Sequence, residues 1–77
     1  MTYNKELFAG NIRAHRARLR MTRDDLSTAT GLSASTIKTY ECAENIPSIE
    51  SAMKLADAFG VSLESLVSNS WDRPESG

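Results

Sequence analysis

The sequence predicts an all-α protein, a compact bundle of five short helices, and three observations carry that prediction. Apolar residues recur at intervals of three and four over several stretches, which is the period of a helix face. Most of these stretches follow a serine or threonine, or stop at a glycine or before a proline. No stretch of useful length alternates apolar and polar residues, so we expect no strand.

The first helix is predicted over residues 5–20. Phe8, Ile12, His15 and Leu19 recur at spacings of four, three and four, which places them on one face. Because His15 lies on this apolar stripe, we interpret it as a partly buried side chain rather than as a ligand or a base.

Residues 23–30 and 34–41 are predicted to form two short helices joined by a tight turn. Gly31 lies where the chain must leave the first of them, a position that often requires a positive φ. Ile37 and Tyr40 are three residues apart and face inward, so the polar residues between them face elsewhere. This pattern is typical of a helix-turn-helix whose second helix enters the major groove of DNA.

Hydroxyl residues mark where these helices begin. Thr22 can cap the helix that follows it, and Asp25, three residues later, completes a capping box. Ser33 can cap the next helix.

A fourth and a fifth helix are predicted after Pro47, which ends whatever precedes it. Ser48 caps the fourth helix, Gly60 stops it, and Ser62 caps the short fifth helix. The inward residues of the two helices are Ala52, Leu55, Ala56 and Phe59 in the fourth, and Leu63, Leu66 and Val67 in the fifth. We therefore assign residues 1–67 to one domain and residues 68–77 to a polar, loosely ordered tail.

The composition excludes several classes of function. No apolar run approaches the roughly 20 residues of a membrane span, and the N-terminus has no signal-peptide core, so we expect a cytoplasmic protein and no membrane partner. One cysteine, Cys42, and one histidine provide neither a disulfide nor a metal site. No glycine-rich phosphate loop or catalytic constellation occurs, so we expect neither an enzyme nor a cofactor.

The charges are unevenly distributed along the chain. Residues 1–40 hold seven basic and three acidic residues, a net charge of +4, whereas residues 41–77 hold two basic and seven acidic residues, a net charge of −5. Together they give the overall charge of −1. The basic half contains the expected groove helix, so its arginines can either contact phosphates or simply solvate a helix surface.

Three segments in this order resemble the phage-repressor and Cro-type (XRE-like) helix-turn-helix family: IRAHR, TRDDLSTATGLSASTIKTYE and PSIESAMKLADAFGVSLESLV. The resemblance covers about residues 7–67. It implies a five-helix fold that binds operator DNA as a symmetric homodimer and regulates transcription, commonly as a repressor.

The resemblance also implies roles for particular residues. Arg16 and Glu41 match a structural ion pair between the first and third helices. The residues that match the family's DNA contacts are Ala34, Ser35, Thr36, Lys38 and Thr39 for the bases, and Thr22, Arg23, Ser33 and Asn45 for the phosphates. None of the base-reading residues is an Asn, Gln or Arg, so we expect a soft readout in which DNA shape takes a large share.

Two departures from the family pattern carry expectations of their own. Ser27 replaces a usual alanine, and we expect it to be tolerated, because serine is nearly as small and can bond to the backbone of its own helix. Ala43 stands where the family often has glycine, and we expect it to resist a left-handed backbone. With Glu44 beside it, Ala43 is expected to weaken the second phosphate contact and to increase the dependence on dimerisation.

The resemblance places the dimer interface in the last helix and beyond, at Leu63, Leu66, Val67 and Trp71. Trp71 can equally fold back on its own helix. An alternative function is a protein-interaction module on the same scaffold, the partner of a toxin or of another regulator, with weak or no DNA binding. The acidic second half favours that alternative, and the basic first half favours DNA.

Overall fold

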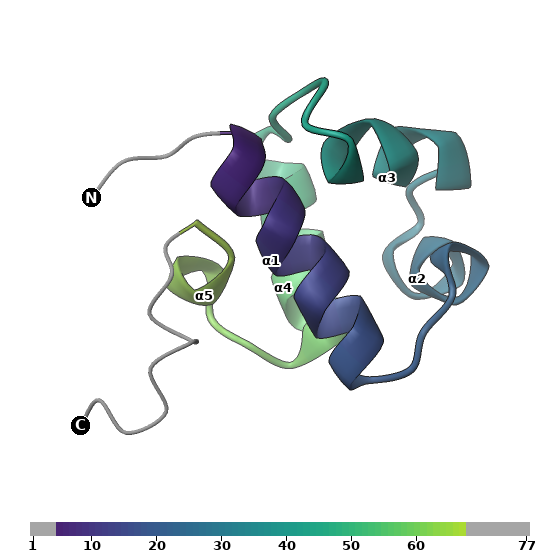
Figure 1. The fold of residues 1–77 in the computed structure, drawn as a ribbon. Helices are drawn as coiled ribbons and strands as arrows, with labels where there is room; N and C mark the ends of the chain where they lie inside the picture. The colour runs from purple at the N-terminus through teal and green to yellow at the C-terminus, as the bar shows by residue number, and fades with distance from the viewer. Residues whose placement is uncertain (1–4, 68–77) are drawn as a thin grey trace.

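The structure is a computed structural model that describes residues 5–67. It contains five α-helices in the order expected (Figure 1): α1 (Lys5–Arg18), α2 (Arg23–Thr30), α3 (Ala34–Glu41), α4 (Ile49–Phe59) and α5 (Leu63–Val67). No strand occurs in the described part of the chain. The prediction of an all-α, five-helix fold is therefore confirmed.

Each predicted helix start and stop has its physical cause in the structure. The Thr22 hydroxyl accepts from the backbone N–H of Asp25, whose carboxylate accepts from the N–H of Thr22 in return, which is a complete capping box. Ser33 and Ser48 cap α3 and α4 in the same position. At the other ends, the prediction that glycine turns the chain is confirmed: Gly31 has φ 80° and Gly60 φ 72°.

The end of the first helix differs from the prediction. α1 stops at Arg18 rather than at residue 20, because Arg20 takes a left-handed conformation with φ 58°. The N–H of Met21 then bonds to the carbonyl of Arg16 at 2.9 Å, which closes the helix end. Leu19 falls outside the helix and is 39% exposed, so its expected place on the buried stripe is wrong.

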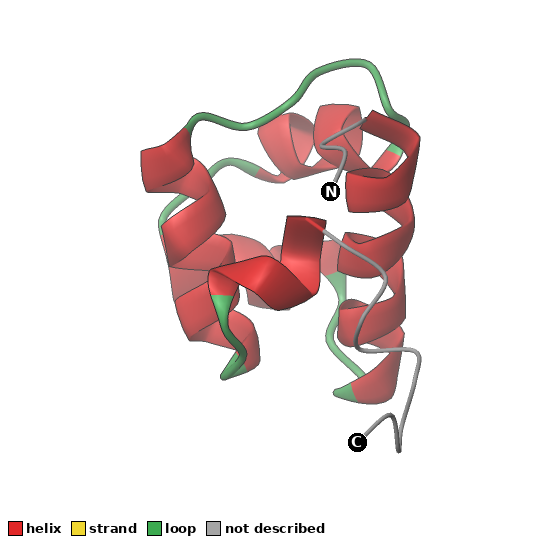
Figure 2. Ribbon diagram, turned by 90° about the vertical axis from the view of Figure 1, so that its left-hand side faces the viewer, coloured by secondary structure: helices red, strands yellow, loops and turns green. Residues whose placement is uncertain are grey.

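Every helix contributes the residues of one face to the core. Its buried apolar members are Phe8, Ile12, Leu26, Ile37, Tyr40, Ala52, Leu55, Ala56, Phe59 and Leu66. α2 packs against α3 and α4, whereas α5 packs against both α1 and α4 (Figure 2). Within residues 5–67, no element covers the outer side of α3.

His15 and Asn11 attach α1 to α4 and α5 through buried polar contacts. The His15 ring is 2% exposed and stacks on Phe59 with ring centroids 5.3 Å apart. Arg18 donates to its Nδ1, so Nε2 carries the proton and donates to the hydroxyl of Ser65. Asn11 donates to the carbonyl of Leu66 at 2.8 Å and so satisfies one free carbonyl at the end of α5. His15 is therefore a core side chain, as expected.

Candidate nucleic-acid interface

α3 is held firmly on its inner side. Ile37 is fully buried, Tyr40 is 8% exposed, and the Phe8 and Tyr40 rings lie with centroids 6.4 Å apart. The last residue of the helix, Glu41, is also buried, although it carries a charge. The C-terminal half of the helix is thus fixed relative to α1, which gives its outward residues a defined orientation.

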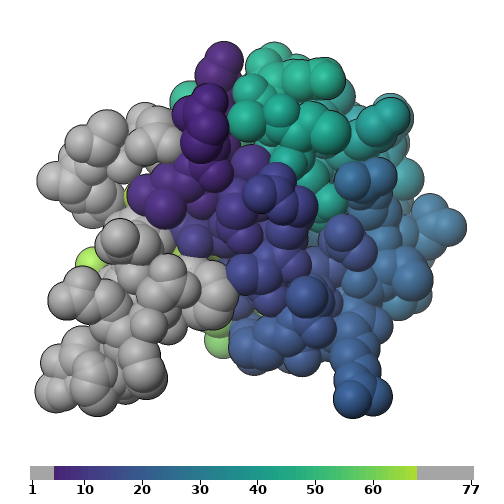
Figure 3. Space-filling view, viewed as in Figure 1, coloured from purple at the N-terminus to yellow at the C-terminus, as the bar shows by residue number. Residues whose placement is uncertain are grey.

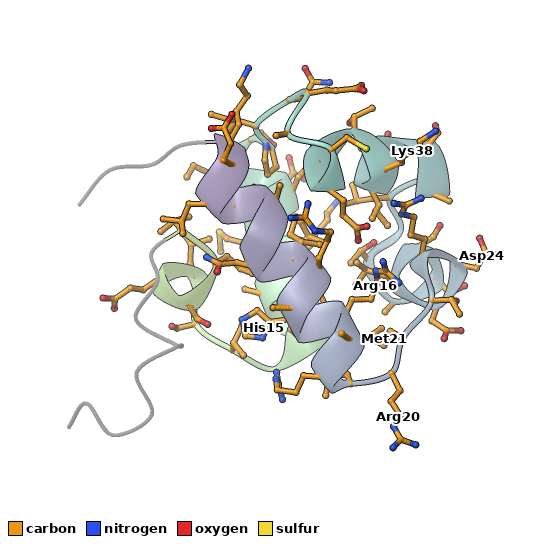
Figure 4. All side chains as sticks on the ribbon, in the orientation of Figure 1. His15, Arg16, Arg20, Met21, Asp24 and Lys38 are labelled. Atoms are coloured by element: carbon orange, nitrogen blue, oxygen red, sulfur yellow. The ribbon has the colours of Figure 1, made fainter. Side chains whose placement is uncertain are left out.

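The outward residues of α3 differ in how free their polar atoms are. Ser35 and Lys38 are exposed, and Lys38 extends away from the helix (Figure 4). Thr36 accepts from the Ser33 hydroxyl at 2.9 Å, and the Thr39 hydroxyl donates to the carbonyl of Thr36 at 2.7 Å. Among the five expected base-reading residues, Ser35 and Lys38 therefore have the most available hydrogen-bonding groups.

Glu41 is the centre of an arginine cluster that joins three helices. Arg16 donates to both of its carboxylate oxygens, from Nε at 2.8 Å and from Nη2 at 3.2 Å, and its Nη1 bonds to the carbonyl of Met21. The structure thus contains the ion pair that the resemblance implied. Because the Glu41 side chain is 0% exposed, these bonds replace all of its hydration.

Two further arginines belong to this cluster, and sequence reasoning missed both roles. Arg23 donates from Nε to Glu41 at 3.0 Å, and Arg13 donates from Nη1 to the backbone carbonyl of the same residue. Spacing along the chain could not indicate these contacts, since Arg13 and Glu41 are 28 residues apart. The cluster, defined here as Arg13, Arg16, Arg23 and Glu41, has three positive charges and one negative charge.

Arg23 combines this structural contact with a place at the start of α2. Its side chain is 39% exposed, and within residues 5–67 only its Nε has a hydrogen-bond partner. Arg23 is the first residue of α2, and a helix N-terminus favours an anion. On the face shown in Figure 3, side chains of α1, α2 and α3 form one continuous surface.

The turn between α2 and α3 is held by two side-chain hydroxyls. The Ser27 hydroxyl donates across the turn to the carbonyl of Leu32 at 2.6 Å and not to a carbonyl of its own helix. Thr30 donates to the carbonyl of Leu26 and accepts from the N–H of Leu32. These bonds satisfy backbone groups that the turn leaves unpaired, and they fix the angle at which α3 follows α2.

The segment after α3 corrects the expectation for Ala43. This residue adopts the left-handed conformation, with φ 60°, despite its Cβ. The N–H of Glu44 then bonds to the carbonyl of Thr39 at 2.9 Å and that of Ala43 to the carbonyl of Tyr40 at 3.2 Å, which closes α3. This closure comes at the cost of local strain at Ala43. Asn45 and Glu44 are both exposed there.

Three of the four residues expected at the dimer interface lie in the described part of the chain, and these three do not form one exposed surface. Leu66 is fully buried in the core of its own chain, so its assignment to an interface is wrong. Leu63 and Val67 are partly buried and pack against the same core. Trp71 and the predicted tail, 68–77, lie outside the described residues.

Within residues 5–67, no helix has the length and apolar character to cross a bilayer. The same residues contain no group of three His, Cys, Asp or Glu side chains placed to hold a metal ion.

A capped helix, a glycine turn and a second helix with a buried inner face and a polar outer face define a helix-turn-helix domain. The chain belongs to the helix-turn-helix family HTH_3, whose family model matches residues 12–66. It therefore carries the DNA-binding helix-turn-helix of transcriptional regulators, and the resemblance stated from the sequence is confirmed. No curated protein is significantly similar to it in sequence.

Solved structures share the fold at low sequence identity. The restriction-modification controller protein C.AhdI from Aeromonas hydrophila superposes with a TM-score of 0.78 and 22% identity, over 80% of this chain and 94% of that one. The hypothetical transcription factor NHTF from Neisseria gives 0.83 and 21%, over 92% and 82%. An HTH_3 family transcriptional regulator from Vibrio cholerae gives 0.79 and 23%, over 84% of this chain and 36% of that longer one.

Proposed function

We propose that this protein represses transcription by binding a near-palindromic operator as a homodimer, with α3 in the major groove. One observation carries the proposal: α3 is anchored by Ile37, Tyr40 and Glu41 on its inner side, while Ser35 and Lys38 on its outer side are exposed. A helix fixed from behind, with free polar groups in front, meets the requirement for insertion into a groove.

Phosphate contacts are expected next to this helix. The arginine cluster around Glu41 has an excess of positive charge, and Arg23 keeps free donors at the N-terminus of α2. The Thr22 hydroxyl oxygen caps α2 and can still donate its proton to an anion. The Ser33 hydroxyl already donates to Thr36, so Ser33 can offer an anion only its backbone N–H. Asn45 supports a further contact from the loop after α3. Such contacts position the domain and make its affinity depend on salt.

Base recognition is expected to be modest. Lys38 can donate to guanine, and the Ser35 hydroxyl can pair with more than one base. Ala34, Thr36 and Thr39 offer methyl groups to thymine, because the hydroxyls of the two threonines are engaged within the helix. DNA shape and two-fold symmetry then supply the remaining specificity, with two α3 helices about 34 Å apart on one DNA face.

Repression is the simplest regulatory outcome for such a domain. A protein that occupies an operator blocks other proteins from the same DNA without any further contact. Activation would additionally require a surface that recruits the transcription machinery.

The test is selection of genomic DNA fragments by the purified protein at two salt concentrations, followed by sequencing of the bound fraction. We expect one near-palindromic site to be enriched and its affinity to fall steeply as salt rises. Lys38→Ala should weaken binding and reduce the salt slope by about one. Arg20→Ala is the matched control, since Arg20 is exposed and points away from α3 (Figure 4).

Two results would contradict the proposal. Equal effects of Lys38→Ala and Arg20→Ala would show that α3 does not face the DNA. Absence of binding even at low salt would instead favour the alternative, a protein-interaction module on the same scaffold, and a pull-down would then identify the partner.

A further inference from the structure

Arg13 reaches from α1 to the C-terminal end of α3. Its Nη1 donates to the backbone carbonyl of Glu41, the last residue of that helix. Carbonyl groups in the last turn of a helix lack partners within the helix, and a cation is favourable beside them. Arg13 is nevertheless exposed, so this contact with the helix end occupies only part of its side chain.

One edge of the Arg13 guanidinium keeps its donors. Within residues 5–67, Arg13 forms a hydrogen bond only through Nη1, and it forms no ion pair with an acidic side chain. A Cβ at Gly10 would lie 4.0 Å from Nη2 of Arg13, so the absence of a side chain at Gly10 leaves room beside the guanidinium. Nε and Nη2 form the edge of an arginine that binds two oxygens of one anion, and here both are available.

The charge of Arg13 is not neutralised by Glu41. Both carboxylate oxygens of Glu41 accept from Arg16 or Arg23, and Arg13 contacts the backbone of Glu41 instead. The arginine cluster has three positive charges and one negative charge, which leaves an excess of two positive charges at the C-terminal end of α3. Such an excess favours the binding of an anion at this end of the helix.

The loop after α3 has no basic residue of its own. Its sequence, CAENIP over residues 42–47, contains one charge, that of the exposed Glu44. A helix of eight residues is about 12 Å long, and the major groove is about 12 Å wide, so the end of an inserted helix lies close to a phosphate strand. The positive charge at this end of α3 therefore comes from arginines of α1 and α2 rather than from the loop.

We propose that Arg13 is a phosphate-binding residue that contacts the DNA strand beside the C-terminal end of α3. This inference rests on the proposed insertion of α3 into the major groove, and it adds a contact from α1 to the phosphate contacts expected around α2 and α3. Nη1 stays on the carbonyl of Glu41, which holds the guanidinium at the helix end, while Nε and Nη2 donate to phosphate oxygens. The same side chain then links the end of α3 to the DNA backbone and supplies the charge that the following loop lacks.

The experiment is titration of the selected operator DNA with the full chain at salt concentrations from about 50 to 200 mM. Arg13→Gln keeps a donor for the carbonyl of Glu41 but removes the charge. Each phosphate contact contributes about 0.9 to the salt slope, so the ratio of wild-type to variant affinity should fall about 3.5-fold per contact over this range.

Two further variants separate a phosphate contact from a purely structural role. Arg13→Lys keeps the charge and should keep the salt slope of the wild type. Arg20→Gln is the matched control, because Arg20 is an exposed arginine that points away from α3 (Figure 4), and this variant should leave the slope unchanged. Circular dichroism checks that each variant is folded.

A neutral phosphate analogue tests whether the contact is direct. Methylphosphonate groups, which lack the phosphate charge, are placed one at a time along the operator. We expect one position in each half-site at which the analogue weakens binding of the wild type but not of Arg13→Gln, because the variant has already lost that contact. If Arg13 acted only by supporting α3, the effects of the variant and of the analogue would add at every position.

Three results would overturn the proposal: Arg13→Gln with the salt slope of Arg20→Gln, Arg13→Lys with a slope as low as that of Arg13→Gln, or additive effects at every methylphosphonate position. The proposed function is judged separately by Lys38→Ala. Binding that depends on Lys38 but not on Arg13 would refute only the contact from α1. Binding that depends on Arg13 but not on Lys38 would keep that contact and refute the insertion of α3. Absence of DNA binding at low salt would refute both.

Discussion

Replacing Glu41 by glutamine tests whether the arginine cluster fixes α3 in place. The substitution keeps the shape of the side chain and one acceptor oxygen but removes its charge. Three hydrogen bonds from Arg16 and Arg23 then lose their anionic partner inside a site where Glu41 is 0% exposed. Two guanidinium groups remain next to each other without a compensating charge.

The loss of stability in Glu41→Gln depends on how far water can hydrate the charges of Arg16 and Arg23. Removal of one partner from a fully buried ion pair costs about 3–5 kcal/mol of folding stability. Here the Arg16 and Arg23 side chains are 24% and 39% exposed, so water already hydrates their charges in part. The cost is therefore lower than for a fully buried pair. We expect Glu41→Gln to lower the free energy of unfolding by about 2–3 kcal/mol. For a domain of this size, the midpoint of thermal unfolding should fall by roughly 10–20 °C.

The assay is urea unfolding followed by circular dichroism, with thermal unfolding as a second measurement. Glu44→Gln is the matched control, because Glu44 follows the same helix but is exposed. It should change stability by less than about 0.5 kcal/mol. Arg16→Gln should cost more than Arg23→Gln, since Arg16 makes two bonds to Glu41 and one to the carbonyl of Met21, whereas Arg23 makes one bond to Glu41. Equal stability of Glu41→Gln and Glu44→Gln would refute the argument.

Two predictions concern backbone conformation, and chemical unfolding measures both. Ala43→Gly should stabilise the protein by about 0.5–1 kcal/mol, because glycine relieves the strain of φ 60° but has more freedom in the unfolded chain. Ala17→Gly, at an exposed site within α1, should destabilise the protein by about 1 kcal/mol. If Ala17→Gly and Ala43→Gly changed the stability in the same direction, the assignment of strain to Ala43 would be contradicted. Gly10→Ala should stabilise α1 by roughly 0.5–1 kcal/mol, because the added Cβ would meet only Arg13 Nη2, at 4.0 Å. A loss of stability there would show that a close approach requires the glycine.

The sequence by itself determined the elements and their ends. Helix periodicity, the capping box of Thr22 and Asp25, and the turn at Gly31 act through neighbours within one or two turns. Such short-range causes can be recognised in a linear chain. The inner face of α3 could be predicted for the same reason, because Ile37 and Tyr40 lie on one side of any helix that contains both.

The end of α1 shows where short-range reasoning stops. Leu19 continued the apolar spacing, yet the chain turns at Arg20, and the carbonyl of Met21 bonds to Arg16 instead of continuing the helix. Ala43 shows the reverse case, since its own preference opposed a left-handed backbone. The closure of α3 overrode that preference by satisfying two carbonyl groups.

Only the tertiary structure decided which distant residues share a site. Arg13, Arg16 and Arg23 converge on Glu41 because α1 and α2 pack against α3, and no spacing in the sequence encodes that convergence. The tertiary structure also decided which apolar residues of the C-terminal half are buried. Leu66 lies in the core, whereas Ile49 and Met53 are exposed. The helical period states which residues share a face, but the packing of one helix on another decides which face is covered.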